Sequence, residues 1–154
     1  MNAIFAIDAR GGLGKQGTLP WPKNKQDFAW FKEHTLGQTV VMGRRTWDDP
    51  AFPKPLPNRT NIVITSGTID IEGVTVVQSI HDVKIPSDAF IIGGAGLIQS
   101  VIEQVDTIYL TRFPDDYGCD VTLDIDTILE DFTVVQGLVG KNIIFEIWKR
   151  CNNT

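Results

Sequence analysis

The chain has 154 residues, enough for one domain that buries roughly two thirds of the surface its unfolded form would expose. Its composition, 42% hydrophobic and 21% charged, lies in the range of globular proteins and excludes a disordered or fibrous protein. The net charge of −5 argues against a general nucleic-acid or membrane-surface binder, because such proteins carry an excess of Lys and Arg.

The N-terminal segment and the cysteines indicate the cellular compartment that we expect for the protein. The apolar run from Ala3 to Ile7 is short and has no basic flank, so we interpret it as a strand rather than a signal peptide. No segment reaches the length of a membrane span. Cys119 and Cys151 lie far apart and lack metal-ligand spacing with a histidine. We interpret both as free thiols and expect a cytoplasmic protein without a bound metal.

Short apolar and β-branched runs recur along the chain and predict a series of strands. They cover Ala3 to Ile7, Thr39 to Met42, Asn61 to Ile64, Val74 to Val77, Ala89 to Ile92, Thr107 to Thr111, Phe132 to Val139 and Ile143 to Trp148. The last two, separated by Gly140-Lys141-Asn142, are expected to form an antiparallel hairpin at one edge.

Helical spacing separates several of these strands. The clearest helix is expected over Lys25 to Thr35, where Phe28 and Phe31 share one side. A second is expected from Gly94 or Ala95 to Val105, and a short one from Arg44. The alternation predicts an α/β fold, one domain over residues 1–154, with a mixed, largely parallel eight-stranded sheet and helices on both faces.

Two glycine turns after buried strands point to anion binding. Gly93-Gly94-Ala95-Gly96 joins a strand to a helix, where backbone N–H groups can approach a phosphate, but Gln99 stands where the Rossmann motif needs its third glycine. Gly43 precedes Arg44 and Arg45 at an expected helix start, where cations oppose the helix dipole unless an anion binds. The alternatives are a tight turn without a ligand and a pair of solvated arginines.

Asp27 is the carboxylate with the strongest claim to a ligand. It lies in the first turn of its helix, where an acid also stabilises the helix by charge alone. Its aromatic neighbours include Trp21 and Phe28, which indicates an apolar pocket in which an amidine-like group would satisfy the carboxylate with two hydrogen bonds. Arg59, on a proline-rich loop, could bind a carboxylate but by itself has no stronger claim than any surface arginine.

The glycine-rich stretch from Arg10 to Pro22 raises the question of a phosphate cradle. A Walker A motif needs Ser or Thr after its Gly-Lys pair and a glycine five residues before the second one, and Gln16 and Ala9 occupy those positions. The stretch is therefore interpreted as a loop that does not bind phosphate by this motif.

In order and spacing, seven segments resemble the dihydrofolate reductase family over nearly the whole chain. They are Leu19-Pro20-Trp21, Asp27-Phe28 with Trp30-Phe31-Lys32, Met42 to Trp47, Pro55 to Asn61, Ile92 to Ala95, Tyr109-Leu110-Thr111 and Phe145 to Trp148. The resemblance implies NADPH-dependent reduction of 7,8-dihydrofolate to 5,6,7,8-tetrahydrofolate, by hydride transfer to C6 and protonation of N5, supplying one-carbon metabolism and thymidylate synthesis. It also implies a monomer that binds antifolates and has no nucleic-acid or membrane partner.

The resemblance also implies roles for matching residues. Asp27 would bind the 2-amino-4-oxo pterin edge and support protonation, with Trp21 holding a water and Thr111 hydrogen bonded to Asp27 and the pterin. Other expected substrate contacts are Ile4, Phe5, Ala6, Leu19, Phe28, Phe31, Lys32, Leu56, Arg59 and Ile92, with Arg59 on the glutamate α-carboxylate. Expected NADPH contacts are Ala6, Leu13, Gly14, Gly43, Arg44, Arg45, Thr46, Thr65, Ser66, Ile92, Gly93, Gly94, Ala95, Gly96, Leu97 and Ile98. The glycine-rich stretch becomes a mobile active-site loop ending at Trp21.

Some positions depart from common family members. Ile98 stands where Tyr or Phe is usual, Phe5 where Ala or Val is usual, and five residues separate Trp21 from Asp27 where many bacterial members have four.

Two other functions remain as alternatives. A related reductase acting on a pyrimidine or ribityl intermediate would not need Leu19-Pro20-Trp21 together with Asp27 and Arg59. A nucleotide-binding or structural module that had lost catalysis would not need Asp27, Trp21 and Thr111 intact.

Overall fold

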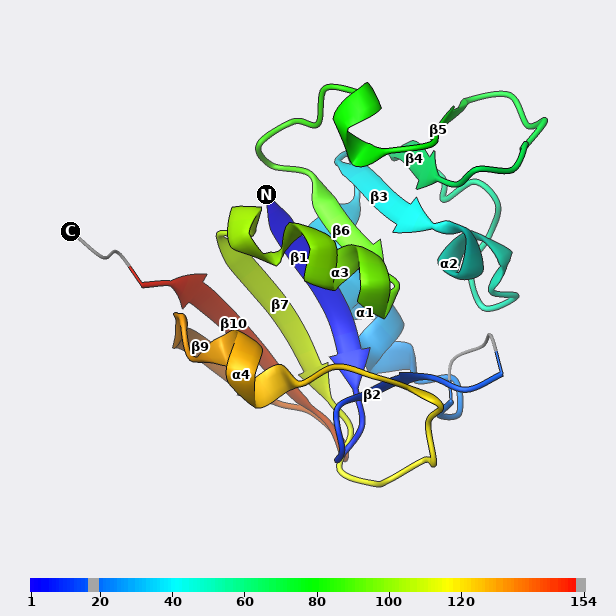
Figure 1. Cartoon of the computed structure of the whole chain (residues 1–154). Helices are drawn as coiled ribbons and strands as arrows, with labels where there is room; N and C mark the ends of the chain where they lie inside the picture. The colour runs from blue at the N-terminus through cyan, green and yellow to red at the C-terminus, as the bar shows by residue number, and fades with distance from the viewer. Residues whose placement is uncertain (17–19, 152–154) are drawn as a thin grey trace.

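The computed structural model describes residues 1–16 and 20–151, which form one eight-stranded sheet, a small second sheet and short helices (Figure 1). The strand order of the large sheet is β5-β4-β3-β6-β1-β7-β10-β9. Its strands are β1 (Asn2–Ile7), β3 (Thr39–Gly43), β4 (Thr60–Ile64), β5 (Val74–Val77), β6 (Phe90–Gly93), β7 (Thr107–Arg112), β9 (Phe132–Val139) and β10 (Ile144–Arg150). Neighbouring strands from β5 to β7 are parallel, and β10 is antiparallel to both β7 and β9. The predicted largely parallel sheet and its antiparallel C-terminal hairpin are confirmed.

Helices cover both faces of this sheet, as predicted. On one face, α3 (Ala95–Val101) and α4 (Ile125–Leu129) pack over a core that includes Ile91 and Leu110. On the other face, α1 (Lys25–Thr35) and α2 (Arg44–Asp48) contribute Trp30 and Trp47 to a second core. Figure 1 shows α3 and α4 in front of the sheet and α1 behind it. The central strands are therefore buried on both sides, which explains their near-continuous apolar sequences.

The helix after the second glycine turn is shorter than predicted. α3 ends at Val101, where φ of −114° and ψ of 3° leave the helical region, and the chain continues as a 3₁₀ turn, η2 (Ile102–Gln104). A further 3₁₀ turn, η1 (Ile80–Asp82), precedes β6. The run of residues predicted as one helix is thus divided between an α-helix and a tighter final turn.

Part of the stretch predicted as a glycine-rich loop forms a strand. β2 (Gly12–Gly14) pairs antiparallel with β8 (Val121–Thr122) in a separate two-stranded sheet. Gly12–Gly14 has no β-branched residue, and Val121–Thr122 is too short to show an alternation. Each segment is ordered by its partner about a hundred residues away in sequence. The prediction of a loop was wrong for Gly12–Gly14.

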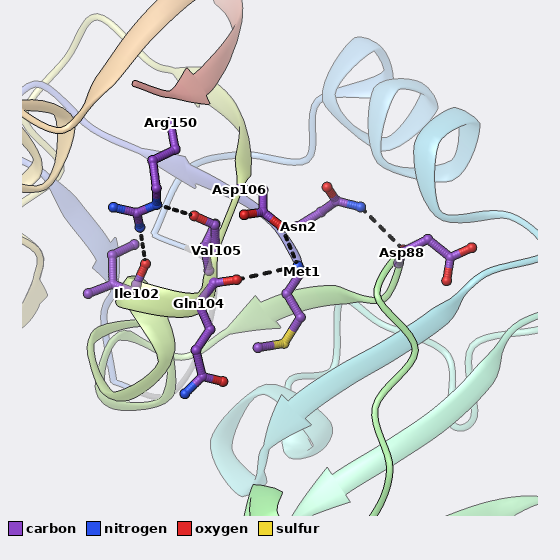
Figure 2. A network of polar contacts seen from close by, with 8 residues as sticks. All are labelled: Met1, Asn2, Asp88, Ile102, Gln104, Val105, Asp106 and Arg150. Atoms are coloured by element: carbon purple, nitrogen blue, oxygen red, sulfur yellow. Dashed lines mark hydrogen bonds and ion pairs between the residues drawn. The ribbon is translucent and has the colours of Figure 1, made fainter. Parts of the chain in front are cut away.

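A polar network fixes the amino ends of the central strands (Figure 2). The Met1 amino group pairs with the Asp106 carboxylate at 3.0 Å, and Asn2 Nδ2 donates to the Asp88 carbonyl at 3.2 Å. Arg150, at the end of β10, donates from Nε to the Val105 carbonyl at 2.9 Å and from Nη2 to the Ile102 carbonyl. These contacts join the start of β1 and the end of β10 to the segment between α3 and β7, and the start of β1 also to the segment before β6.

Cys119 and Cys151 are both free thiols, as predicted. Among residues 1–16 and 20–151, no helix is both long and apolar enough to cross a membrane, and no group of three or more His, Cys, Asp or Glu side chains is placed to hold a metal.

Candidate active site

A largely apolar cleft opens beside the carboxyl ends of β1, β6 and β7, between α1, α2 and β2. Its walls combine predicted substrate and cofactor residues with three that the sequence did not suggest. The lining residues are Ile4, Phe5, Ala6, Leu13, Trp21, Asp27, Phe28, Trp30, Phe31, Thr46, Asp49, Phe52, Ile92, Gly93, Gly94 and Thr111. Small-molecule sites commonly occupy such a position outside the carboxyl ends of parallel strands.

Asp27 is one of two carboxylates that line this cleft, the other being Asp49. It lies in the first turn of α1, and its backbone N–H donates to the side chain of the N-cap residue Asn24 at 3.0 Å. Burial raises the pKa of Asp27 to about 6, although a hydrogen bond with the Thr111 side chain acts in the opposite direction. Thr111 is itself only 1% exposed on β7. Asp27 can therefore gain or lose a proton close to neutral pH.

Trp21 brings an unsatisfied donor to the same cleft. Its indole stacks on Phe113 with ring centroids 4.5 Å apart, and its side chain is only 6% exposed. The indole Nε1 has no hydrogen-bond partner in the part of the chain that the structure describes. Because a buried polar group without a partner is costly, this N–H is suited to hold a water or a ligand atom.

Arg59 is held against the last residue of α1. Its Nε donates to the Pro57 carbonyl at 2.9 Å and its Nη1 to Thr35 Oγ1 at 3.2 Å, while the guanidinium lies 5.8 Å from the centre of the Phe31 ring. Partial burial lowers the pKa of Arg59. Phe31 lines the cleft, so the guanidinium is fixed beside one of its walls.

Two other predicted substrate residues lie outside the cleft wall. Leu56 is buried in the core that contains Trp30 and Trp47, and its backbone N–H and C=O are both bonded to the Asn61 side chain at 3.0 Å. Lys32 is exposed on α1. Leu19 lies outside the described residues.

A second cleft shares a wall with the first. It is lined by Leu13, Gly14, Arg45, Thr46, Asp49, Gly94, Gly96 and Val121, of which Leu13, Thr46, Asp49 and Gly94 also line the first cleft. At Gly93, φ is 140°, and a Cβ there would lie 2.9 Å from Thr46 Oγ1. Glycine is therefore required for this turn to lie against α2.

The surroundings of this second cleft suit an anionic ligand. α2 follows Gly43 and α3 follows Gly94, and neither N-cap has a side-chain hydrogen bond. The first turn of α2 contains no acid, while Arg44 and Arg45 are both exposed there. The helix-start backbone N–H groups and the exposed Arg45 thus lie beside a glycine-lined surface, while Arg44 is paired with Asp48.

Arg44 is oriented toward the end of β4. Its Nε donates to both carboxylate oxygens of Asp48 at 3.1 and 3.2 Å, and its Nη1 donates to the Thr68 carbonyl at 3.2 Å. Thr65 Oγ1 accepts the Gly67 N–H at 3.1 Å in the same turn. The structure therefore brings Arg44 to the turn after β4 that contains Thr65 and Ser66, although none of these three residues lines the second cleft.

Some predicted cofactor residues lie outside the walls of both clefts. Ile98 is fully buried in the core beneath α3, and Ala95 belongs to the same core, with Leu97 packed against it. These side chains are not among those that line the two clefts. Their contact with a cofactor stays a prediction.

Four residues that line the clefts were not predicted from the sequence as site residues: Trp30, Asp49 and Phe52 in the first cleft and Val121 in the second. Asp49 follows Thr46 by three residues, a spacing that places both near one helix end and could have indicated a shared site. No local signal marked Val121, because the long-range pairing of β8 with β2 brings it there. Phe52 lies in the proline-rich loop, where residue spacing predicts little.

Comparisons with known proteins agree with this geometry. A protein-family model described as dihydrofolate reductase matches residues 1–138. The dihydrofolate reductase of Bacillus subtilis (strain 168) is 39% identical over 125 residues, covering 78% of this chain and 73% of the relative. That of Staphylococcus aureus (strain N315) is 36% identical over 143 residues, covering 92% and 87%. A solved dihydrofolate reductase from Enterococcus faecalis, complexed with NADP(H) and RAB-propyl, has a TM-score of 0.81 and 30% identity, covering 98% of this chain and 96% of that one.

Proposed function

The chain belongs to the dihydrofolate reductase family, and from this premise we propose that it reduces 7,8-dihydrofolate to 5,6,7,8-tetrahydrofolate with NADPH, supplying one-carbon metabolism and thymidylate synthesis. The observation that carries the proposal is the placement of Asp27. Its carboxyl group, with a pKa raised to about 6, lies in an apolar cleft that shares a wall with a glycine-lined, cationic one.

Asp27 binds and orients the substrate in this proposal. A carboxylate in an apolar cleft is best satisfied by a ligand edge that offers two parallel N–H donors, as the 2-amino-4-oxo pterin edge does. The raised pKa lets the group hold a proton near neutral pH, so that it can support protonation at N5. The unsatisfied indole N–H of Trp21 holds the water through which that proton passes, and Thr111 keeps the Asp27 carboxyl group oriented.

The rest of the substrate follows the apolar wall. Phe28, Phe31 and Ile92 exclude water from the reacting carbon and the aromatic portion of the ligand. Arg59, held by Pro57 and Thr35, pairs with the α-carboxylate of the glutamate tail. The remaining proposed contacts are Ile4, Phe5, Ala6, Leu19, Lys32 and Leu56.

The second cleft fits NADPH, which supplies the hydride when bound. Gly93 and Gly94 let the backbone approach the pyrophosphate, and Arg44 and Arg45 supply positive charge to the phosphates, including the 2′-phosphate. The other proposed contacts are Ala6, Leu13 and Gly14 at the nicotinamide, with Gly43, Thr46, Thr65, Ser66, Ile92, Ala95, Gly96, Leu97 and Ile98 along the cofactor. These residues orient the cofactor against the substrate cleft, which is the protein's main contribution to hydride transfer.

We propose further that residues 1–154 act as one domain and as a monomer in the cytoplasm, the compartment that keeps thiols such as Cys119 and Cys151 reduced. Antifolates are expected to compete with dihydrofolate for the cleft around Asp27.

The deciding experiment mixes the purified protein with NADPH and dihydrofolate and follows the loss of reduced-nicotinamide absorbance. The parent protein is expected to turn over. Asp27→Asn, which cannot carry the proton, is expected to lose about a hundredfold or more in rate at neutral pH. Absence of NADPH oxidation by the parent protein would sink the proposal.

A further inference from the structure

Asp8 is a buried carboxylate that the proposed mechanism does not use. It follows β1 directly, is only 3% exposed, and accepts four hydrogen bonds. Oδ1 accepts the N–H groups of Arg10 at 2.9 Å and Gly12 at 2.8 Å. Oδ2 accepts the N–H of Tyr117 at 3.0 Å and the thiol of Cys119 at 3.3 Å. One carboxylate therefore joins the glycine-rich segment to the loop between β7 and β8.

Backbone contacts make these two segments a continuous unit. Ala9 donates to the Asp115 carbonyl at 3.0 Å, and Asp120 donates to the Gly14 carbonyl at 3.1 Å. The packing is close, because a Cβ on Gly12 would lie 2.4 Å from Cys119 Sγ. The same Cβ would lie 2.9 Å from the Asp8 carboxyl carbon. Gly12 is thus needed for the segments to approach each other over Asp8.

This unit forms part of both clefts. Leu13 lines the two of them, while Gly14 and Val121, on opposite strands of the small sheet, line the second. The loop also contains Phe113, on which Trp21 stacks, and Phe113 donates its N–H to the Ile7 carbonyl at 2.9 Å. Movement of one segment relative to the other would therefore displace residues at the cofactor and substrate walls together.

We propose that Asp8 is a positioning residue for hydride transfer, holding residues 9–14 and 115–122 as one wall that places Leu13 and Gly14 at the nicotinamide. The inference rests on the proposed function, because it gives that reaction a residue that touches neither ligand. Arg44 and Arg45, which are proposed to hold the phosphates, lie on a different element, α2. Asp8 should therefore govern the alignment of the nicotinamide of NADPH and leave the binding of its phosphates unaffected.

The ionisation of the two side chains suits this role. Burial acts to raise the pKa of Asp8, but the hydrogen bonds from Tyr117, Gly12, Arg10 and Cys119 outweigh it and hold the pKa below its ordinary value. Burial and the neighbouring Asp8 carboxylate, with Asp116 and Asp120 nearby, raise the pKa of the Cys119 thiol to about 11. The acceptor stays charged and the thiol stays a donor over the pH range in which Asp27 titrates.

The test compares Asp8→Ala and Asp8→Asn with the parent under single-turnover conditions with both ligands saturating. Hydride transfer is expected to fall about ten- to a hundredfold in Asp8→Ala, because small misplacements of reacting groups have effects of this size. The Kd for NADPH is expected to stay within about threefold, since its phosphates are held elsewhere. In the pH profile, the plateau should fall while the midpoint set by Asp27 stays in place. A rate within about twofold of the parent, with only a lower Tm, would overturn the proposal.

Matched variants separate positioning from general destabilisation. Asp82 likewise accepts a backbone N–H, from Ser79 at 3.1 Å, but lies on η1; Asp82→Ala should lower Tm and leave hydride transfer unchanged. If Asp8→Ala fails to fold, variants of its donor Cys119 provide the test. Cys119→Ser keeps a hydrogen-bond donor to Asp8 and should transfer hydride at the parental rate, whereas Cys119→Ala should slow hydride transfer. Equal rates for these two variants would count against the role of the carboxylate.

Amide hydrogen exchange provides a readout that does not depend on activity. In Asp8→Asn, one acceptor oxygen is replaced by an NH2 group, so the amide of Gly12 or that of Tyr117 loses its acceptor. At least one of these two amides should exchange faster than in the parent, whereas both should exchange at parental rates in Asp82→Ala. If the parent protein itself fails to oxidise NADPH, the proposed function falls and the positioning role falls with it. If the parent is active but these amides exchange at parental rates in Asp8→Asn, the proposed function stands and the role of Asp8 is refuted.

Discussion

Two carboxylates of the same residue type are tuned in opposite directions. Asp27 lies in the cleft with one side-chain hydrogen bond from Thr111, so burial dominates and its pKa rises to about 6. Asp8 is also buried, but four donors converge on it and hold its pKa below the ordinary value. The number of hydrogen-bond donors, rather than burial, decides which acid can exchange a proton near neutral pH.

The raised pKa of Asp27 has a consequence for stability. Because the folded state binds this proton more tightly than the unfolded state, the stabilising effect is complete below the unfolded pKa of 3.8 and is lost as pH rises through about 6. Asp27→Asn removes the buried charge, so at pH 8 the ligand-free variant should be more stable than the parent by on the order of 2 kcal/mol. Denaturant unfolding at several pH values checks this. A difference between variant and parent that does not grow from pH 5 to pH 8 would contradict it.

Arg44 should distinguish the two nicotinamide cofactors. Its guanidinium is oriented by Asp48 and the Thr68 carbonyl beside Thr65 and Ser66. Arg44→Ala should weaken NADPH binding by about tenfold or more, the size expected for loss of a charged hydrogen bond, and weaken NADH binding little. Fluorescence titration measures both, and Lys84→Ala, which removes an exposed cation outside the two clefts, is the control. Equal weakening of both cofactors would remove Arg44 from the 2′-phosphate.

At the scale of elements, the N-cap of α1 is expected to stabilise the helix and to position Asp27. Asn24 caps the helix by accepting the N–H of Asp27, so the cap also fixes the backbone of the residue that carries the proton. Asn24→Ala should lower the free energy of unfolding by about 1 kcal/mol, and Asn24→Ser, which retains a capping oxygen, should lower it less. Denaturant unfolding compares the two variants. If both behave like the parent, the cap does not contribute to stability.

The elements that could be predicted from sequence are those with a strong local pattern. The buried parallel strands have near-continuous apolar sequences, and the spacing of Phe28 and Phe31 predicted α1, with the bounds that the structure has. β2 and β8 are too short to show such a pattern, and they could not be predicted because their order comes from pairing with each other. Within the site, Asp27 and the glycine turns were recognisable from residue chemistry, whereas Val121 and the contacts of Asp8 depend on segments brought together by the fold.

On the scale of the whole molecule, the proposed reaction site and a polar network that stabilises the fold lie at opposite ends of the parallel strands. The clefts adjoin the carboxyl ends of β1, β6 and β7, where Ala6, Gly93 and Thr111 lie. The network of Met1, Asp106 and Arg150 lies at the amino end of β1 (Figure 2). Parallel pairing makes this separation possible, because it places all equivalent strand ends on the same edge.

Arg150→Ala tests that separation. The side chain donates to the Val105 and Ile102 carbonyls and lies 4.6 Å from the centre of the Phe132 ring, so its loss removes two hydrogen bonds and a cation–π contact. The free energy of unfolding should fall by about 2 kcal/mol. Arg150→Lys, which keeps the charge but lacks the planar pair of donors, should recover only part of it. Because the network lies at the opposite strand ends from the clefts, single-turnover hydride transfer measured well below the Tm should stay within about twofold of the parent. A loss of rate in proportion to the loss of stability would show that the two ends of the sheet are coupled.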